Sequence, residues 1–533
     1  MANSFLWWRD GIIYQIYPRS FADSNGDGIG DLNGIRGKLD YLQDLGVDAI
    51  WLSPIFPTPD ADFGYDVADY NAIDPRFGTM EDFRCLLDEA HRRGIRVILD
   101  LVLNHTSDQH RWFQESRKSR DNPYRDWYFW RDPAPNGGPP NNWQSRFGGS
   151  GWKFDPATGQ YYFHMFYPEQ PDLNWRNPEV RAAMLDVFRF WLDMGVDGFR
   201  LDVFNAYFKH EDLPSNPAKI GLIGWDRQHH RYDHSQPEMK PLIKEIRAIL
   251  DSYSERYAVG ETFENSVQET AAYMGPEGLH AAFNFTFTNC PWRPGRFLKA
   301  VLEWEAALQP EDWPNYVLNN HDVVRSATRY GVGEDDERLK VAAAMLLTLR
   351  GTPFMYYGEE IGMRNIRMRR SEILDRVGRR YWPFYKGRDG CRAPMQWTGG
   401  VNAGFSEGKP WLPVHPDHVF RSVEAQDEQP NSLLNFYRRL IRTRRTEPAL
   451  RSGLFLPVTY EPRSLLAYLR KTKDQTLLVA LNFSRRPNRL VLGGALSGPQ
   501  WELVLSSSRD DLSAEVRHEI ELLGDEALIL RQR

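Results

Sequence analysis

Cysteine is scarce in this sequence. Cys85, Cys290 and Cys391 are the only three among 533 residues, and they are widely separated. An odd, scattered set argues against a disulfide framework or a zinc site and is typical of a reducing compartment. Long hydrophobic stretches are also missing: no apolar run reaches the roughly 18 residues of a membrane-spanning helix. The N-terminal stretch lacks a basic segment followed by an apolar one, so we expect a cytoplasmic protein with no membrane partner.

A surplus of positive charge is absent as well. The 66 Lys and Arg residues are outnumbered by 72 Asp and Glu residues, which gives a net charge of −6 at pH 7. This balance provides no electrostatic attraction to nucleic acid or to an anionic membrane. The chain also contains no GxGxxG turn of the kind that binds dinucleotides, and no organic cofactor is expected.

Short apolar segments alternate with stretches of helical spacing as far as about residue 360. Eight strands with helices between them predict an α/β fold, a (β/α)8 TIM barrel, in preference to an open doubly wound sheet. The expected strands are 11–18, 49–55, 96–105, 198–204, 257–262, 281–287, 315–322 and 353–360.

Three segments depart from this alternation. Residues 106–170 are rich in Trp, Pro, Asn, Gly and Tyr and lack a helical period, so we expect a small domain inserted after strand three. Residues 361–415 form a second irregular insertion. From residue 453 to 533, short strands at turn-like spacing predict a C-terminal antiparallel β-sandwich. The barrel is then assigned to 1–105 and 171–452.

The fourth expected strand, GFRLDVF, carries Arg200 and Asp202 among apolar residues. Side chains alternate along a strand, so the two charged residues share one face. One such residue is most simply a cap or an ion-pair partner. Several carboxylates at the C-terminal mouth of a barrel, where active sites lie, favour catalysis instead. The second expected strand is followed by Asp62, Tyr65 and Asp66. The residues at the ends of other expected strands are Asp100, Asn104, His105, Glu261, Asn320, His321 and Asp322.

Paired carboxylates without a nucleotide loop or a zinc motif indicate glycoside hydrolysis. Asp202 is the expected nucleophile, and we expect Arg200 to keep it ionised by lowering its pKa. Glu261 is the expected proton donor to the leaving oxygen, with a pKa raised by burial and neighbouring negative charge. In a retaining enzyme the two carboxyl groups lie roughly 5–5.5 Å apart.

These strand ends resemble the conserved motifs of glycoside hydrolase family 13, the α-amylase family. The matching segments are DLVLNH (100–105), QPDLNW (170–175), GFRLDVFNA (198–206), GETF (260–263) and NNHD (319–322). The similarity covers essentially the whole chain and points to the α-glucosidase and oligo-1,6-glucosidase branch. It implies a retaining mechanism through a glucosyl-Asp202 intermediate.

The resemblance also implies roles for further residues. Asp322 would grip the ring hydroxyls in the transition state, and Arg388 with Asp62 would hold the non-reducing end, as expected of an exo-acting enzyme. Arg392 is the alternative to Arg388. The remaining residues implied for the sugar pocket and the scissile bond are Tyr65, His105, Arg200, His321, Phe147, Phe166 and Gln170.

Residues 23–31, DSNGDGIGD, follow the start of a calcium-binding loop. The spacing places Asp23, Asn25, Asp27 and Asp31 as oxygen ligands, and Ile29 offers its carbonyl. The twelfth position is Gly34, so the loop is not an EF-hand; a plain Asp/Gly turn is the alternative. The family branch implies a structural Ca²⁺ in a loop of this form, with Mg²⁺ as the other candidate ion.

Three functions remain open. The first is an α-glucosidase acting on short gluco-oligosaccharides, with transglucosylation as an accompanying reaction. The second is a transglucosylase or sucrose isomerase on the same scaffold. The third, a non-catalytic transporter heavy chain, is disfavoured because the catalytic carboxylates are all present. In having Val203 after the nucleophile, the chain resembles glucosidases that accept α-1,6 bonds, whereas its segment 205–217 resembles the α-1,4 group. The linkage preference is therefore not predicted. The oligomeric state is not predicted either.

Overall fold

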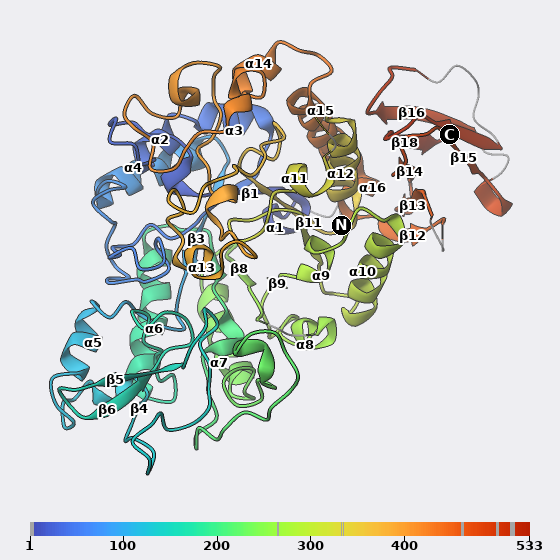
Figure 1. Cartoon of the computed structure of the whole chain (residues 1–533). Coiled ribbons are helices and arrows are strands. Elements are labelled where there is room, and N and C mark those ends of the chain that lie inside the picture. Colours follow the sequence, from blue (N-terminus) through green and yellow to red (C-terminus); the bar gives the residue numbers. More distant parts are fainter. Residues whose placement is uncertain are drawn as a thin grey trace. The chain divides into compact units, whose positions relative to one another are not determined.

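The computed structural model describes residues 5–263, 266–331, 333, 335–459, 463–496, 500–511 and 518–533 (Figure 1). The chain divides into two compact units. The first contains Met1–Ile50, Glu89–Ile95 and Asn284–Arg533, and the second contains Trp51–Asp88 and Arg96–Phe283. Within the described residues, no helix has the length and apolar character needed to cross a membrane.

One eight-stranded sheet accounts for the alternating pattern in the sequence. Its strand order is β10-β11-β1-β2-β3-β7-β8-β9. The neighbours β10 and β11, β11 and β1, β3 and β7, β7 and β8, and β8 and β9 pair in parallel. Counted from β1, this is the sequential order of eight parallel strands, which confirms the predicted (β/α)8 barrel. The strands are β1 Ile13–Ile16, β2 Ala49–Leu52, β3 Arg96–Leu101, β7 Gly198–Leu201, β8 Tyr257–Gly260, β9 Ala281–Ala282, β10 Asn315–Val317 and β11 Thr352–Tyr356.

Local capping signals explain where the helices begin. Helix α6 starts after Asn177, whose side chain accepts the backbone N–H of Glu179, and Pro178 occupies its first position. The α-helices of the described chain are α1 Trp7–Asp10, α2 Leu32–Arg36, α3 Leu39–Leu45, α4 Met80–Arg92, α5 Arg111–Ser116, α6 Pro178–Asp193, α7 Met239–Asp251, α8 Val267–Ala271, α9 Phe285–Thr288, α10 Pro294–Ala307, α11 Ser326–Tyr330, α12 Glu337–Thr348, α13 Arg376–Tyr381, α14 Val423–Asp427, α15 Leu433–Thr446 and α16 Pro448–Ser452.

Two expected elements differ from the structure. The strand predicted over 281–287 ends at Ala282, because the Asn284 side chain accepts the backbone N–H of Thr286 and starts helix α9. The helical stretch expected between the first two strands is divided into α2 and α3. Asp31 caps α2 by accepting the N–H of Gly34, so the first of these two helices begins at Leu32.

The segment after the third strand contains a small antiparallel sheet, ordered β4-β6-β5, with β4 Trp130–Arg131, β5 Trp152–Asp155 and β6 Gln160–Phe163 (Figure 1). Its aromatic residues form a buried cluster that continues into the residues after β7. The members are Phe129, Trp143, Trp152, Phe163, Met165, Phe166, Val203, Ala206, Leu213 and Trp225. The insert therefore shares its core with the turn that follows Asp202.

The C-terminal residues fold into a five-stranded sheet, β12-β13-β14-β18-β16, and a two-stranded sheet, β15-β17, both antiparallel. Leu478 and Leu528 of the first sheet share a buried cluster with Leu490 and Ile520 of the second, which confirms the predicted β-sandwich. The domain boundaries assigned from the sequence stay predictions. The strands are β12 Leu454–Pro457, β13 Leu465–Lys471, β14 Thr476–Asn482, β15 Asn488–Val491, β16 Trp501–Ser506, β17 Glu519–Leu522 and β18 Ala527–Gln532.

Candidate active site

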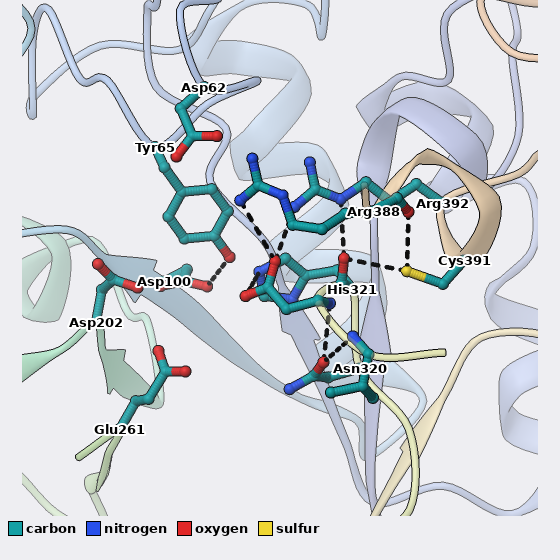
Figure 2. Close-up of polar contacts among 12 residues, drawn as sticks. Asp62, Tyr65, Asp100, Asp202, Glu261, Asn320, His321, Arg388, Cys391 and Arg392 are labelled. Carbon is teal, nitrogen blue, oxygen red and sulfur yellow. Dashed lines mark hydrogen bonds and ion pairs between the residues drawn. The ribbon is translucent and has the colours of Figure 1, made fainter. Parts of the chain in front are cut away.

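Two of the predicted carboxylates follow neighbouring strands of the second unit. Asp202 comes directly after β7 and Glu261 directly after β8, and these strands pair with Leu201 opposite Gly260. The backbone N–H of Asp202 donates to Leu101 O at 3.0 Å, and that of Glu261 donates to Leu201 O at 2.9 Å. Figure 2 shows both carboxyl groups at these strand ends. The parallel register thus brings together the two residues expected to act on the glycosidic bond.

Arg200 is the cation that joins these carboxylates. Its Nη1 lies 2.6 Å from Asp100 Oδ1 and 2.7 Å from Asp202 Oδ1, and its Nη2 donates to Glu261 Oε2. The Arg200 side chain is only 2% exposed. Burial by itself lowers the pKa of Arg200, but Asp100 and Asp202 raise it above its ordinary value, so the guanidinium stays charged.

The pKa of Asp202 differs from the sequence-based expectation. Burial raises the pKa of Asp202 to about 6, and Asp100 adds to this effect, although Arg200 lowers it as predicted. The expectation of a net lowering was wrong because the sequence does not show how completely the strand end is buried. Asp202 is 7% exposed as a whole residue.

We expect kcat/KM to fall as the pH is lowered through about 6. Asp202 must be ionised to attack carbon, and its carboxyl group has a pKa of about 6 in the free enzyme. The measurement is kcat/KM against pH with 4-nitrophenyl α-glucoside, with intrinsic fluorescence at each pH to verify folding. A rate constant that stays level down to pH 4 in folded enzyme would contradict the assignment.

The turn after Asp202 has an unusual backbone. Val203 has φ 32° and ψ 42°, in the left-handed region that β-branched residues rarely adopt. The next residue, Phe204, donates its N–H to Glu261 O at 3.2 Å, which ties this turn to the residue expected to act as the acid. The left-handed turn therefore sets the direction in which the chain leaves the nucleophile.

Predicted pocket residues of the second unit lie close together. Tyr65 donates its hydroxyl to Asp100 Oδ2 at 3.0 Å (Figure 2), and His105 Nε2 lies 2.8 Å from Tyr65 O. Gln170 Nε2 lies 3.0 Å from the same carbonyl and 3.5 Å from Asp62 Oδ2. These four residues are nearly inaccessible to solvent, so their orientations are fixed by the fold.

Aromatic rings border this group. The ring centroids of Phe166 and His105 are 5.2 Å apart, and those of Phe147 and Phe166 are 5.4 Å apart. Phe166 also contacts Phe263, two positions after Glu261, at 6.2 Å. The predicted aromatic residues of the insert thus lie beside the residues expected to contact the sugar.

The first unit supplies a second group of predicted residues. Asp322 Oδ1 accepts from Arg392 Nη2 at 2.9 Å and lies 3.6 Å from Arg388 Nη1. His321 Nε2 is 3.3 Å from Asp322 Oδ2, and Figure 2 shows Arg388 and Arg392 beside His321. Asn320 holds the turn by accepting the N–H of Asp322 at 2.8 Å.

The two arginines have different surroundings. Arg392 is fully buried and also donates to His321 O at 2.8 Å, so it fixes the Asp322 segment. Arg388 retains 10% side-chain exposure and is oriented by Asp375 through contacts of 3.0 and 3.2 Å. Burial would raise the pKa of Asp375, but Arg388 brings it below its usual value. The more accessible Arg388 is therefore better placed to meet a ligand.

Some residues that contact these two groups were not selected from the sequence. Gln15 of β1 lies 2.8 Å from His321 Nδ1, and Tyr17 stacks on His321 with centroids 6.1 Å apart. Trp51 Nε1 donates to Asp100 Oδ2 at 3.2 Å. Gln15 carried a usable signal, because a polar residue inside an apolar strand is the same pattern that identified Arg200.

The predicted metal loop is held by hydrogen bonds. Asp23 accepts the backbone N–H groups of Gly26 and Gly28 at 2.8 Å, and Asn25 accepts that of Asp27 at 2.9 Å. Both carboxylate oxygens of Asp31 accept from Ser24 at 2.8 Å, and one also caps α2.

The fit of this loop to a cation is therefore incomplete. Its oxygen donors suit a hard ion, but Asp31 is already engaged as a cap. In the described ranges, no cluster of three or more His, Cys, Asp or Glu side chains is arranged to hold a metal. The calcium site stays a prediction.

Comparison with known proteins places these motifs in context. The family model "Alpha amylase, catalytic domain" matches residues 15–453. A probable α-glucosidase of Rhizobium meliloti is 45% identical over 90% of this chain and 89% of that protein. An oligo-1,6-glucosidase of Parageobacillus thermoglucosidasius is 40% identical over 99% of both chains. The crystal structure of an α-glucosyl transfer enzyme, XgtA, has a TM-score of 0.93 at 42% identity, covering 99% of this chain and 100% of that one.

Proposed function

Since the chain belongs to the α-amylase family of glycoside hydrolases, we propose that it is a retaining α-glucosidase that releases glucose from the ends of short gluco-oligosaccharides. The observation that carries this proposal is the pair of carboxylates, Asp202 and Glu261, on neighbouring strand ends and joined by Arg200. The expected substrate is a sugar, and we propose that it is a short oligosaccharide.

The reaction proceeds in two displacements. Asp202 attacks the anomeric carbon while the glycosidic C–O bond breaks, and Glu261 gives its proton to the leaving oxygen. Glu261, now ionised, removes a proton from water, and the oxygen of that water displaces Asp202 from the glucosyl carbon. Two inversions produce net retention. Asp322 is proposed to bind ring hydroxyls in the transition state, the role that the family resemblance implies.

Arg200 contributes in both steps. Its contacts with Asp100, Asp202 and Glu261 place a fixed positive charge beside the reacting carboxylates. This charge offsets part of the burial that raises the pKa of Asp202, so that more of the nucleophile is ionised near neutral pH. The arginine also fixes the nucleophile through a hydrogen bond of 2.7 Å.

Exo-action predicts glucose as the first product of a long substrate. In a time course with end-labelled maltoheptaose, we expect glucose and maltohexaose before any fragment of intermediate length. The proposed reason is that Arg388 binds terminal hydroxyls through its charged, bidentate donors, and this requires a chain end. Arg388→Ala should lower kcat/KM by roughly 10-fold or more, and Arg421→Ala, a paired arginine of the same unit, is the control. Mid-length fragments appearing first would establish endo-action.

Glucosyl transfer is the second candidate, favoured by the similarity to the α-glucosyl transfer enzyme XgtA. A sugar hydroxyl would replace water in the second displacement and receive the glucosyl group from Asp202. Product analysis with maltose, isomaltose, sucrose and trehalose separates the alternatives. Glucose as the main product supports hydrolysis, whereas longer or isomeric sugars support transfer or isomerisation. The same experiment determines the linkage preference.

We further propose that residues 23–31 bind a structural Ca²⁺, or Mg²⁺, through Asp23, Asn25, Asp27 and Ile29 O, with Asp31 closing the loop. A cation that binds only the folded state stabilises it by mass action, by about 2.7 kcal/mol at 100 times its Kd. EDTA is therefore expected to lower the melting temperature by a few degrees without changing the initial rate of folded enzyme. Asp27→Asn, an exposed position, should remove the effect of EDTA. An immediate loss of rate without unfolding would contradict a structural role.

We propose a cytoplasmic location because the cysteines are not paired in disulfides. Cys85, Cys290 and Cys391 are all free thiols, and burial raises the pKa of Cys290 to about 11 and that of Cys391 to about 12. Unpaired cysteines, two of them buried, are typical of a reducing compartment.

A further inference from the structure

A fully buried lysine lies near the candidate active site and has no part in the reaction above. Lys209 belongs to the segment after Asp202 and is 1% exposed. Its Nζ lies 2.5 Å from Asp172 Oδ2, and neither side chain is accessible to solvent. Because the desolvation of two charges offsets most of their attraction, a buried ion pair adds little stability by itself. Its contacts point to a different role.

The ion pair surrounds the amide of Asn104. Lys209 Nζ donates to Asn104 Oδ1 at 2.8 Å and to Ala206 O at 2.6 Å. Asn104 Nδ2 donates to Asp172 Oδ2 at 2.9 Å. The amide oxygen thus faces the cation and the amide nitrogen faces the anion. A reversed amide would bring the NH₂ group against the ammonium and the oxygen against the carboxylate, so only one orientation is favourable.

The orientation of the Asn104 amide determines which group faces the His105 ring. Asn104 Nδ2 lies 3.1 Å from His105 Nδ1, and an NH₂ group can only donate, so Nδ1 must accept. On the other side of the ring, Nε2 lies 2.8 Å from the carbonyl oxygen of Tyr65, which can only accept. Nε2 also lies 3.1 Å from the amide nitrogen of Gln170, which can only donate, so the Nε2 side alone is compatible with either tautomer. The Asn104 contact therefore decides between them, because it requires a bare Nδ1 and leaves the proton of a neutral ring on Nε2.

The charges around the ring agree with a neutral histidine. Burial is the largest effect on His105 and lowers its pKa, and Lys209 lowers it further, whereas Asp172 and Asp202 raise it. The net result is a pKa below the ordinary value.

We infer that the buried Lys209–Asp172 ion pair is a positioning device that, through the amide of Asn104, holds His105 as the neutral Nε2–H tautomer at the sugar site. Lys209, Asp172 and Asn104 act through His105 and are positioning residues. The benefit to catalysis rests on the proposed glucosidase function, whereas the tautomer itself does not.

The direct test is ¹⁵N NMR of the full-length protein labelled with [¹⁵N]histidine, with the His105 signals assigned from a His105→Asn variant. We expect the neutral Nε2–H pattern for His105 at all pH values between 5 and 8. A Nδ1–H pattern, or titration of His105 to the imidazolium within that range, would overturn the inference. This NMR measurement needs no substrate, so its result does not depend on the glucosidase proposal.

The ion pair is tested by removing both charges together. Asp172→Asn with Lys209→Met leaves no unpaired buried charge and frees the Asn104 amide to turn. We expect both tautomers of His105 in this variant, and kcat/KM lower by roughly 10- to 100-fold, as for other residues that orient a site group. A single Nε2–H pattern with unchanged kcat/KM would overturn the role of the ion pair.

A second variant tests the same coupling if the first variant fails to fold. Asn104→Asp presents an acceptor to Nδ1, so His105 should gain a proton there and show the imidazolium pattern at neutral pH. A His105 that stays Nε2–H and neutral in this variant would contradict the coupling. Lys340→Met is the matched control, because Lys340 is also buried and paired, at 2.6 Å from Glu337, and should leave the His105 signals unchanged.

Discussion

Replacement of Asp202 by Asn is expected to lower kcat by about 10⁴-fold or more while the protein still folds and binds sugar. The amide is nearly the same size as the carboxylate, but it cannot attack the anomeric carbon to form the glucosyl-enzyme. Arg200 keeps Asp100 and Glu261 as partners in the variant, so the buried guanidinium is not left without an anion. The measurements are kcat on maltose, the affinity for glucose by calorimetry, and the melting temperature.

Asp197→Asn is the control for this substitution. Asp197 immediately precedes the same strand, β7, and accepts the N–H of Val97 at 2.9 Å and Nη1 of Arg96 at 3.0 Å. It lies at the opposite end of the strand from Asp202, so its loss should reduce stability and leave kcat nearly unchanged. If Asp202→Asn retained the rate of the Asp197→Asn variant, Asp202 would not be the nucleophile.

Glu261→Gln is expected to lower kcat on maltose by roughly 10²- to 10⁴-fold, the usual contribution of a general acid–base group. The effect should depend on the leaving group. With 4-nitrophenyl α-glucoside the departing phenolate needs little protonation, so the glucosyl-enzyme forms and its hydrolysis becomes slow. We expect a burst of nitrophenol followed by a slow phase. Azide should restore turnover, because an anionic nucleophile needs no general base, and should produce α-glucosyl azide.

Glu255→Gln serves as the matched control. Glu255 lies just before β8, at the other end of the strand from Glu261, and pairs with Arg96 on the protein surface at 3.4 Å. It should show neither the burst nor the azide effect. A Glu261→Gln variant without rescue by azide, or with equal losses on both substrates, would assign Glu261 a role other than acid–base catalysis.

The parts of the fold that follow from local pattern were predictable. Alternation of apolar strands with helical stretches identified all eight barrel strands, and the charged residues inside and after apolar segments located Arg200, Asp202 and Glu261. The strand predicted over 281–287 was too long, because the Asn284 side chain accepts a backbone N–H and begins helix α9. An apolar pattern does not reveal this side-chain effect.

What the sequence did not reveal depends on contacts between distant segments. The raised pKa of Asp202 results from burial, which becomes known only when the loops around the strand end are placed. The Lys209–Asp172 pair joins a residue after β7 to one just after the insert, and neither segment's pattern shows that the two charges meet. Such pairs follow from tertiary structure, so no periodicity or spacing predicts them.

The shared core of the insert and the turn after β7 has a consequence for transplanting loops between relatives. Val203 has a strained left-handed backbone, and its side chain is buried in the same cluster as Trp143 and Phe163 of the insert. Burial of that side chain offsets the strain, so the turn is stable only against an insert of matching shape. An insert exchanged alone would leave Val203 facing a foreign surface and move the nucleophile. Chimeras that carry 106–170 together with 203–236 from one parent should therefore retain activity, whereas those that divide the two segments between parents should fold but lose it.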